Sequence, residues 1–168
     1  MTTHDLREEI DALLSAGLAI AGTPEWKDTN REGQKRWKAP LVLDGSSTGI
    51  NFTIDHYPNM PFKGTHLILE RGISFVRVDI GKNVSHKNRP PNMPEGIPEG
   101  ILRGDHIHSW PLNRRLATSK KLPEHLAFAD YLPQNLNDFS DIFPWFCDLH
   151  NIKYGFETPK LPVRDTLL

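Results

Sequence analysis

The chain has 168 residues, which is enough for a single domain (residues 1–168) built around one hydrophobic core. None of its apolar runs approaches the length that crosses a bilayer, so we expect no membrane partner. Acidic rather than basic residues stand near the N-terminus, and the only cysteine, Cys147, lies among aromatic residues, which suits a buried thiol. These features together predict a cytoplasmic protein.

The net charge of -1 is unevenly distributed along the chain. Residues 77–121 contain nine Lys or Arg against four Asp or Glu, whereas the segments on both sides are acidic. A local excess of positive charge attracts negatively charged molecules, so this stretch predicts an anionic ligand. The alternative is a solvated loop in which the lysines and arginines have no ligand.

Apolar residues recur at helical spacing between Leu6 and Leu14 and predict an N-terminal helix. From Trp37 onward the apolar period changes to two, which predicts four strands, at 37–43, 49–57, 65–71 and 73–80. The connections between them are too short for helical crossovers, so we expect antiparallel pairing.

A fifth strand is predicted at residues 105–110, and helical spacing returns after Pro123. The expected fold class is therefore α+β. It has an N-terminal helix, an antiparallel sheet of about five strands, and C-terminal helices that cover one face of the sheet.

His106 and His108 form the most specific candidate site. Residues two apart on a strand point to the same face and lie about 7 Å apart along it, so the two imidazoles can bind one metal ion or bracket one phosphate. A third ligand from His86, His66 or Asp79 would complete a metal site with an open position. The alternative is a pair of surface histidines without any ligand.

The same residues also suit catalysis without a metal ion. One histidine can take a proton from a hydroxyl while the other protonates the leaving oxygen of a phosphodiester. Trp110 offers a surface on which a base can stack. Four arginines are candidates for stabilising the charge of the substrate: Arg77, Arg89, Arg114 and Arg115. For any single arginine, surface solvation is the alternative.

Several short segments between residues 67 and 152 occur in a recognisable order. They are Leu69-Glu70-Arg71-Gly72, Arg77-Val78-Asp79-Ile80, His86-Lys87-Asn88, Asp105-His106-Ile107-His108 and the aromatic-rich segment 143–152. This order resembles a group of small uncharacterised bacterial and phage proteins with an H-x-N loop followed by an H-x-H strand. The resemblance groups His86 with His106 and His108, and it implies no particular reaction.

Two functions are predicted from these observations. The first is a small phosphodiesterase or ribonuclease-like enzyme that acts on RNA or a nucleotide through His86, His106 and His108, with or without a divalent metal ion. The second is a protein–protein interaction module, such as a phage-type inhibitor or a toxin–antitoxin component, with residues 82–104 as the contact surface. Convergence of the three histidines in space would favour the enzyme.

Overall fold

Four long strands in direct succession form the centre of the main sheet. They are β3 (Lys35–Leu43), β4 (Ser46–His56), β5 (Thr65–Arg71) and β6 (Ile73–Ile80), and each pairs antiparallel with the next. A tight turn joins β3 to β4 at Asp44 and Gly45, which both have positive φ, as the twist of a two-residue hairpin requires. The four strands predicted from the sequence are therefore confirmed, with small changes at their ends.

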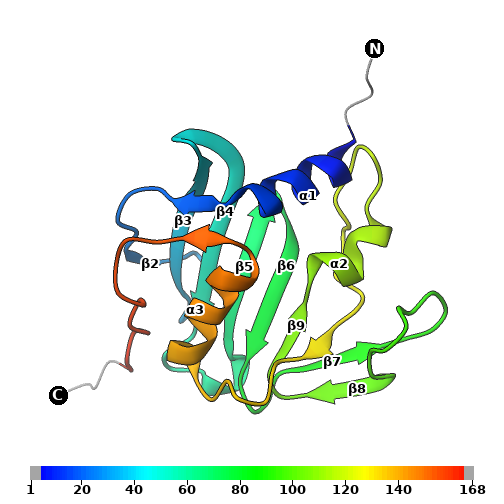
Figure 1. The fold of residues 1–168 in the computed structure, drawn as a ribbon. Coiled ribbons are helices and arrows are strands. Elements are labelled where there is room, and N and C mark those ends of the chain that lie inside the picture. Colours follow the sequence, from blue (N-terminus) through cyan, green and yellow to red (C-terminus); the bar gives the residue numbers. More distant parts are fainter. Residues whose placement is uncertain (1–4, 165–168) are drawn as a thin grey trace.

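The structure, a computed structural model, describes residues 5–164, and within them the main sheet contains nine strands (Figure 1). Its order is β10-β9-β6-β5-β4-β3-β1-β11, with β2 also paired to β3. The further strands are β1 (Leu18–Ile20), β2 (Trp26–Asp28), β9 (His106–His108), β10 (Asp130–Tyr131) and β11 (Ile152–Lys153). The prediction of about five strands is wrong, because strands of two or three residues are too short to show an alternating pattern.

The pairing of β1 with β11 is parallel, with Leu18 opposite Ile152. The main sheet is therefore mixed, not antiparallel throughout as predicted. A second, two-stranded sheet consists of β7 (Ser85–Asn88) and β8 (Gly100–Arg103), and this hairpin lies beside β9 (Figure 1).

Three α-helices accompany the sheets in the described residues: α1 (Leu6–Ala16), α2 (Trp110–Asn113) and α3 (Phe139–Leu149), with short 3₁₀ helices η1 (Pro61–Lys63) and η2 (Arg114–Leu116). Helix α3 packs its aromatic side against β4, where the Phe52 ring stacks on Phe143 at 5.6 Å and on Phe146 at 5.0 Å. The predicted group of C-terminal helices is a single helix, because α2 comes earlier, between β9 and β10. None of the helices in residues 5–164 combines the length and the apolar character needed to cross a membrane.

Two buried asparagines hold the segment before β10 in place. The Asn88 amide donates to the Ala129 carbonyl at 2.8 Å and accepts from the Ala129 N–H at 2.9 Å. Asn113 makes the same pair of hydrogen bonds with Phe128, at 2.8 Å and 3.0 Å. The segment therefore receives hydrogen bonds that a neighbouring strand would otherwise supply. It lies between the β7–β8 hairpin and α2.

Candidate functional site

A row of charged and imidazole side chains crosses the main sheet from β4 to β9. Asp55 is paired with His66, His66 with Asp79, and Asp79 with His106. Residues directly opposite each other on neighbouring strands point to the same face of a sheet, so these four side chains share one face. Ion pairs reinforce the row, with His66 Nδ1 2.7 Å from Asp79 Oδ1.

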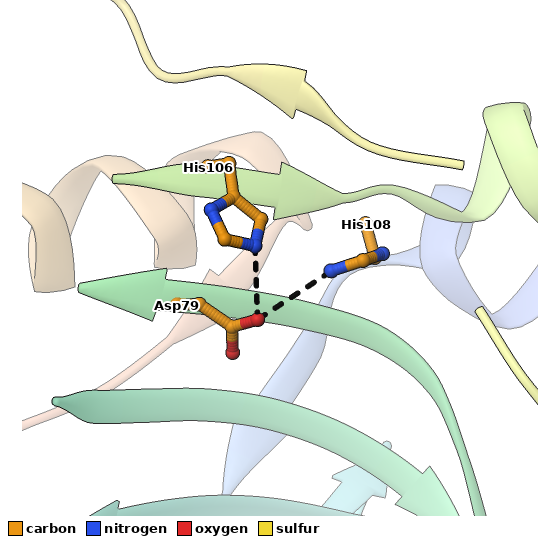
Figure 2. A group of neighbouring side chains, drawn as sticks. All are labelled: Asp79, His106 and His108. Carbon is orange, nitrogen blue, oxygen red and sulfur yellow. Dashed lines mark ion pairs between the residues drawn. The ribbon is translucent and has the colours of Figure 1, made fainter. Parts of the chain in front are cut away.

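Asp79 lies at the centre of the histidine cluster (Figure 2). Its Oδ2 is 3.1 Å from His106 Nε2 and 3.4 Å from His108 Nε2, and both histidines project from β9 toward it. Ile107, between them, is buried with only 7% of its surface exposed. The prediction that His106 and His108, two apart on this strand, point to the same face is confirmed.

The carboxylate of Asp79 has further partners in His66 and Arg77. Arg77 Nε lies 2.8 Å from Oδ1 and 3.0 Å from Oδ2. Burial acts to raise the pKa of Asp79, but the hydrogen bond donated by His66 and the charge of Arg77 act against it, and the pKa of Asp79 lies well below its usual range. Asp79 is therefore a carboxylate anion at neutral pH.

The hydrogen-bond partners of His106 and His108 determine which nitrogen carries the proton in the neutral ring. His106 Nδ1 donates to the Gly104 carbonyl at 2.7 Å, so Nε2 presents its lone pair toward Asp79. Arg77 Nη2 donates to His108 Nε2 at 3.1 Å, so this nitrogen is also an acceptor. Burial lowers the pKa of His108 to about 4, which makes its neutral form the one present at pH 7.

His86 approaches the cluster from the β7–β8 hairpin. Its ring centroid lies 4.5 Å from that of His108 and 6.1 Å from that of His106. His86 Nε2 donates to the Ala127 carbonyl at 2.8 Å, so the neutral ring has its lone pair on Nδ1. Burial lowers the pKa of His86 below its ordinary value. The structure thus brings together the three histidines that the sequence grouped.

Access to the cluster differs between its members. His106 and His108 are completely buried, and Asp79 is 5% exposed. The side chains of Arg77 and His66 are 37% and 24% exposed. Together with the half-buried His86, Arg77 and His66 form the side of the cluster that a dissolved molecule can reach.

Four residues predicted to bind substrate lie outside the cluster. Arg114 forms an ion pair with Asp11 of α1 at 2.7 Å, and Arg89 and Arg115 are exposed. Trp110 is 3% exposed and donates from Nε1 to Asp11, so its ring offers no free surface to a base. The predicted strand 105–110 ends at His108, and Trp110 is the first residue of α2, followed by a proline that suits this position of a helix.

Two features of the site had no counterpart in the sequence analysis. The first is the central position of Asp79, which was one of three candidates for a third ligand and which follows from the register of β6 and β9. The second is the segment 127–129, whose Ala127 carbonyl holds His86. The second feature depends on Asn88 and Asn113, which bind this segment from the β7–β8 hairpin and from α2. A single sequence does not show that these two polar residues are buried.

Asp79, His106 and His108 each offer one ligand atom, and these three atoms lie within 4.8 Å of one another. Such a group can hold a metal ion, while Arg77 beside it can pair with an anion. Comparison of the chain with protein-family models, curated proteins and solved structures finds no match. The function therefore has to be inferred from the geometry of this site.

Proposed function

We propose that the protein is a hydrolase of phosphodiester bonds, which acts on RNA or a nucleotide at the cluster around Asp79. The observation that supports it is the convergence of His86, His106 and His108 on one carboxylate next to Arg77. Imidazoles are the side chains best suited to proton transfer near neutral pH, and a guanidinium pairs with the oxygens of a phosphate.

His86 and Arg77 are the residues that meet the substrate in this proposal. His86 Nδ1 accepts the proton of the attacking hydroxyl, because its other nitrogen already donates to Ala127, and a water molecule gives a proton to the leaving oxygen as the P–O bond breaks. The Arg77 guanidinium is more than one-third exposed and stabilises the charge that develops on the phosphorus oxygens. Both side chains contact His108, so they act on the same bound group.

His106 and His108 take a different part from the acid–base pair expected from the sequence. Complete burial keeps both rings from direct contact with a substrate while the cluster keeps this arrangement. Their part in the proposal is to surround Oδ2 of Asp79 and, through that carboxylate, to fix the guanidinium of Arg77. They are positioning residues, whereas His86 is the general base.

Incubation of the full-length protein with a panel of RNAs and of cyclic and linear oligonucleotides, with and without divalent ions, tests the proposal. His86→Ala and Arg77→Ala should each lower the cleavage rate by about 100-fold or more. His125→Ala removes an exposed histidine outside the cluster and is the matched control, expected to cleave as the wild type does. Absence of cleavage on every substrate, or equal rates in the wild type and His86→Ala, would overturn the proposal.

One observation favours the alternative, a protein–protein interaction module. Ile101 of β8 lies within residues 82–104, the predicted contact surface, and is 54% exposed, so its side chain is available to a partner. A complex with a protein partner that survives His86→Ala but is lost with Ile101→Asp, in a protein that cleaves no substrate, would support this alternative.

A further inference from the structure

We infer that Asp79, His106 and His108 form a binding site for one divalent transition-metal ion, with Zn²⁺ the ion whose ligand preferences fit best. The inference deepens the proposed function and rests on it in one respect, because it names the cofactor of that same site. Its evidence is the arrangement of lone pairs, distances and charges around Asp79 Oδ2.

The ring nitrogens of His106 and His108 that lie nearest to Asp79 face its Oδ2. His106 Nε2 and His108 Nε2 both present lone pairs, since the opposite nitrogen of His106 donates to Gly104 and Arg77 donates to His108 Nε2. Both nitrogens point at Oδ2 of Asp79, which is itself an acceptor. Arg77 donates to Asp79 Oδ2 and to His108 Nε2, so in the neutral rings His106 Nε2 is the acceptor of this group that no donor or cation reaches.

His106 Nε2 shows the consequence of this arrangement. The atom is buried and, among the described residues, has no hydrogen-bond partner, although it lies 3.1 Å from Asp79 Oδ2. Buried polar atoms in folded proteins almost always have a partner, and a bound ion or water is one of the explanations for an atom that lacks one. A proton on Nε2 would pair His106 with Asp79 alone, whereas a metal ion would contact all three residues.

The distances suit a single ion. Two ligand atoms that each lie about 2.1 Å from a tetrahedral ion are about 3.4 Å apart. In the structure, Asp79 Oδ2 is 3.1 Å from His106 Nε2 and 3.4 Å from His108 Nε2, and all three atoms lie within 4.8 Å of one another. The third distance, between the two imidazole nitrogens, is at most 4.8 Å, and it shortens when both rings turn toward one ion. Two histidines and one carboxylate leave a fourth position open, as in catalytic zinc sites.

The surrounding groups orient two of the three ligands, His106 and Asp79. His106 donates its other ring nitrogen to a backbone carbonyl, that of Gly104, which is the usual way to orient a metal-binding imidazole. His66 donates to Asp79 Oδ1 at 2.7 Å and so fixes the carboxylate with Oδ2 facing the two histidines. Such outer contacts hold ligands in place before the ion arrives.

The charge of Arg77 opposes metal binding and gives the inference its sharpest test. Its guanidinium neutralises Asp79 and covers the lone pair of His108 Nε2. A divalent ion therefore has to displace Arg77 from His108, which is feasible because the side chain is 37% exposed and can turn toward solvent. Two positive groups remain close together after loading, and they attract an anionic substrate. The ion itself supplies a Lewis acid for the substrate oxygen and lowers the pKa of bound water.

The test is Zn²⁺ titration of full-length protein that carries no affinity tag and has been treated with chelator. We expect one ion per chain in the wild type and in His125→Ala, and at least 100-fold weaker binding in Asp79→Asn, which keeps the shape of the side chain but removes its charge. Arg77→Gln should bind Zn²⁺ at least tenfold more tightly than the wild type. Co²⁺ in place of Zn²⁺ should show the visible absorption of a four-coordinate ion.

Absence of saturable Zn²⁺ and Co²⁺ binding by the folded wild type, or equal binding in Asp79→Asn, would overturn the inference. If Asp79→Asn does not fold, Arg77→Gln decides, because unchanged or weaker binding in that variant contradicts the displacement of the guanidinium. One bound ion without cleavage of any substrate would leave the metal site standing and overturn the proposed function. Cleavage at a rate that neither chelator nor added ions change would leave the proposed function standing and overturn the ion as its cofactor.

Discussion

The side chain of Asn88 pairs with the main chain of Ala129 through two hydrogen bonds, as a residue of a neighbouring strand would. The same amide also donates to the Pro98 carbonyl at 2.7 Å. Asn88 is 1% exposed, so no water can replace these partners. Asn88 thereby binds the β7–β8 hairpin, which carries His86, to the segment 127–129. The Ala127 carbonyl of that segment accepts the hydrogen bond of His86.

Replacing Asn88 by Ala should therefore lower the free energy of unfolding by about 2–4 kcal/mol, because it leaves the N–H and C=O of Ala129 buried without partners. Amide hydrogen exchange at Ala129 should become faster, and the increase should be larger than the loss of global stability alone would cause. The matched control is Asn135→Ala, at an exposed position, which should leave both quantities unchanged. Unaltered stability of Asn88→Ala in urea unfolding would mean that the hairpin is held by other contacts.

The ends of β5 and β6 approach closely at Gly64, whose φ is +74°. A Cβ atom there would lie 2.5 Å from the Ile80 carbonyl oxygen and 2.6 Å from a methyl group of Val84. Gly45 has a similar φ of +79° but open space around it. We expect Gly45→Ala to cost about 1 kcal/mol, from backbone strain alone, and Gly64→Ala about 2–4 kcal/mol, from strain and overlap together. Equal losses for the two variants in thermal unfolding would contradict the close approach.

His150 should make the protein less stable in acid. The ring is 5% exposed against Phe146, and burial lowers the pKa of His150 to about 4 from an ordinary value of 6.5. Between these two pH values the unfolded chain binds a proton that the folded protein does not, so stability falls as the pH drops from 6.5 toward 4. By pH 5 the loss from this one group is about 2 kcal/mol.

Urea unfolding at pH 7 and at pH 5 measures this effect. His150→Leu should lose about 2 kcal/mol less than the wild type between the two pH values, since leucine binds no proton. The exposed His125 provides the control, because His125→Leu should show the pH dependence of the wild type. The same pH dependence in His150→Leu and wild type would show that the buried ring is not held neutral.

Cys147 should resist chemical modification in the native protein. The thiol is completely buried on α3, and burial raises the pKa of Cys147 to about 12, so almost no thiolate is present at pH 7. Alkylation by iodoacetamide should be undetectable without denaturant and should rise with the unfolded fraction in urea. Rapid modification of the folded protein at pH 7 would contradict the packing of α3 on β4.

The long central strands could be predicted from the sequence because each shows several alternations between apolar and polar residues. Phe52, for example, lies in a run where Ile50, Phe52 and Ile54 alternate with polar residues. All three are buried in β4, although Thr53 and Asp55 between and beside them are buried as well. The short strands β1, β10 and β11 have only two or three residues each, and they form because a neighbouring strand offers unpaired backbone groups. No local pattern encodes such pairing.

In the candidate site, too, features set within one strand could be predicted, whereas features set by contacts between distant segments could not. The common direction of His106 and His108 is a property of one strand and was visible in their spacing. The placement of Asp79 between them depends on the register of β6 against β9, in which Val78 is paired with Ile107. The place of His86 depends on contacts with residues some forty positions away. Trp110 was misplaced because the alternating pattern was extended past Ser109, although Pro111 is a signal for the start of a helix.

The parallel pairing of β1 with β11 has a consequence for the order in which the chain can complete its fold. Leu18 is paired with Ile152, so one edge of the main sheet joins residues from opposite ends of the chain. During synthesis the early strands emerge long before α3 and β11, and the apolar face around Phe52 then lacks the rings of Phe143 and Phe146. The partly made chain therefore exposes an aromatic surface until its last segments are made, and exposed apolar surface of this kind favours aggregation.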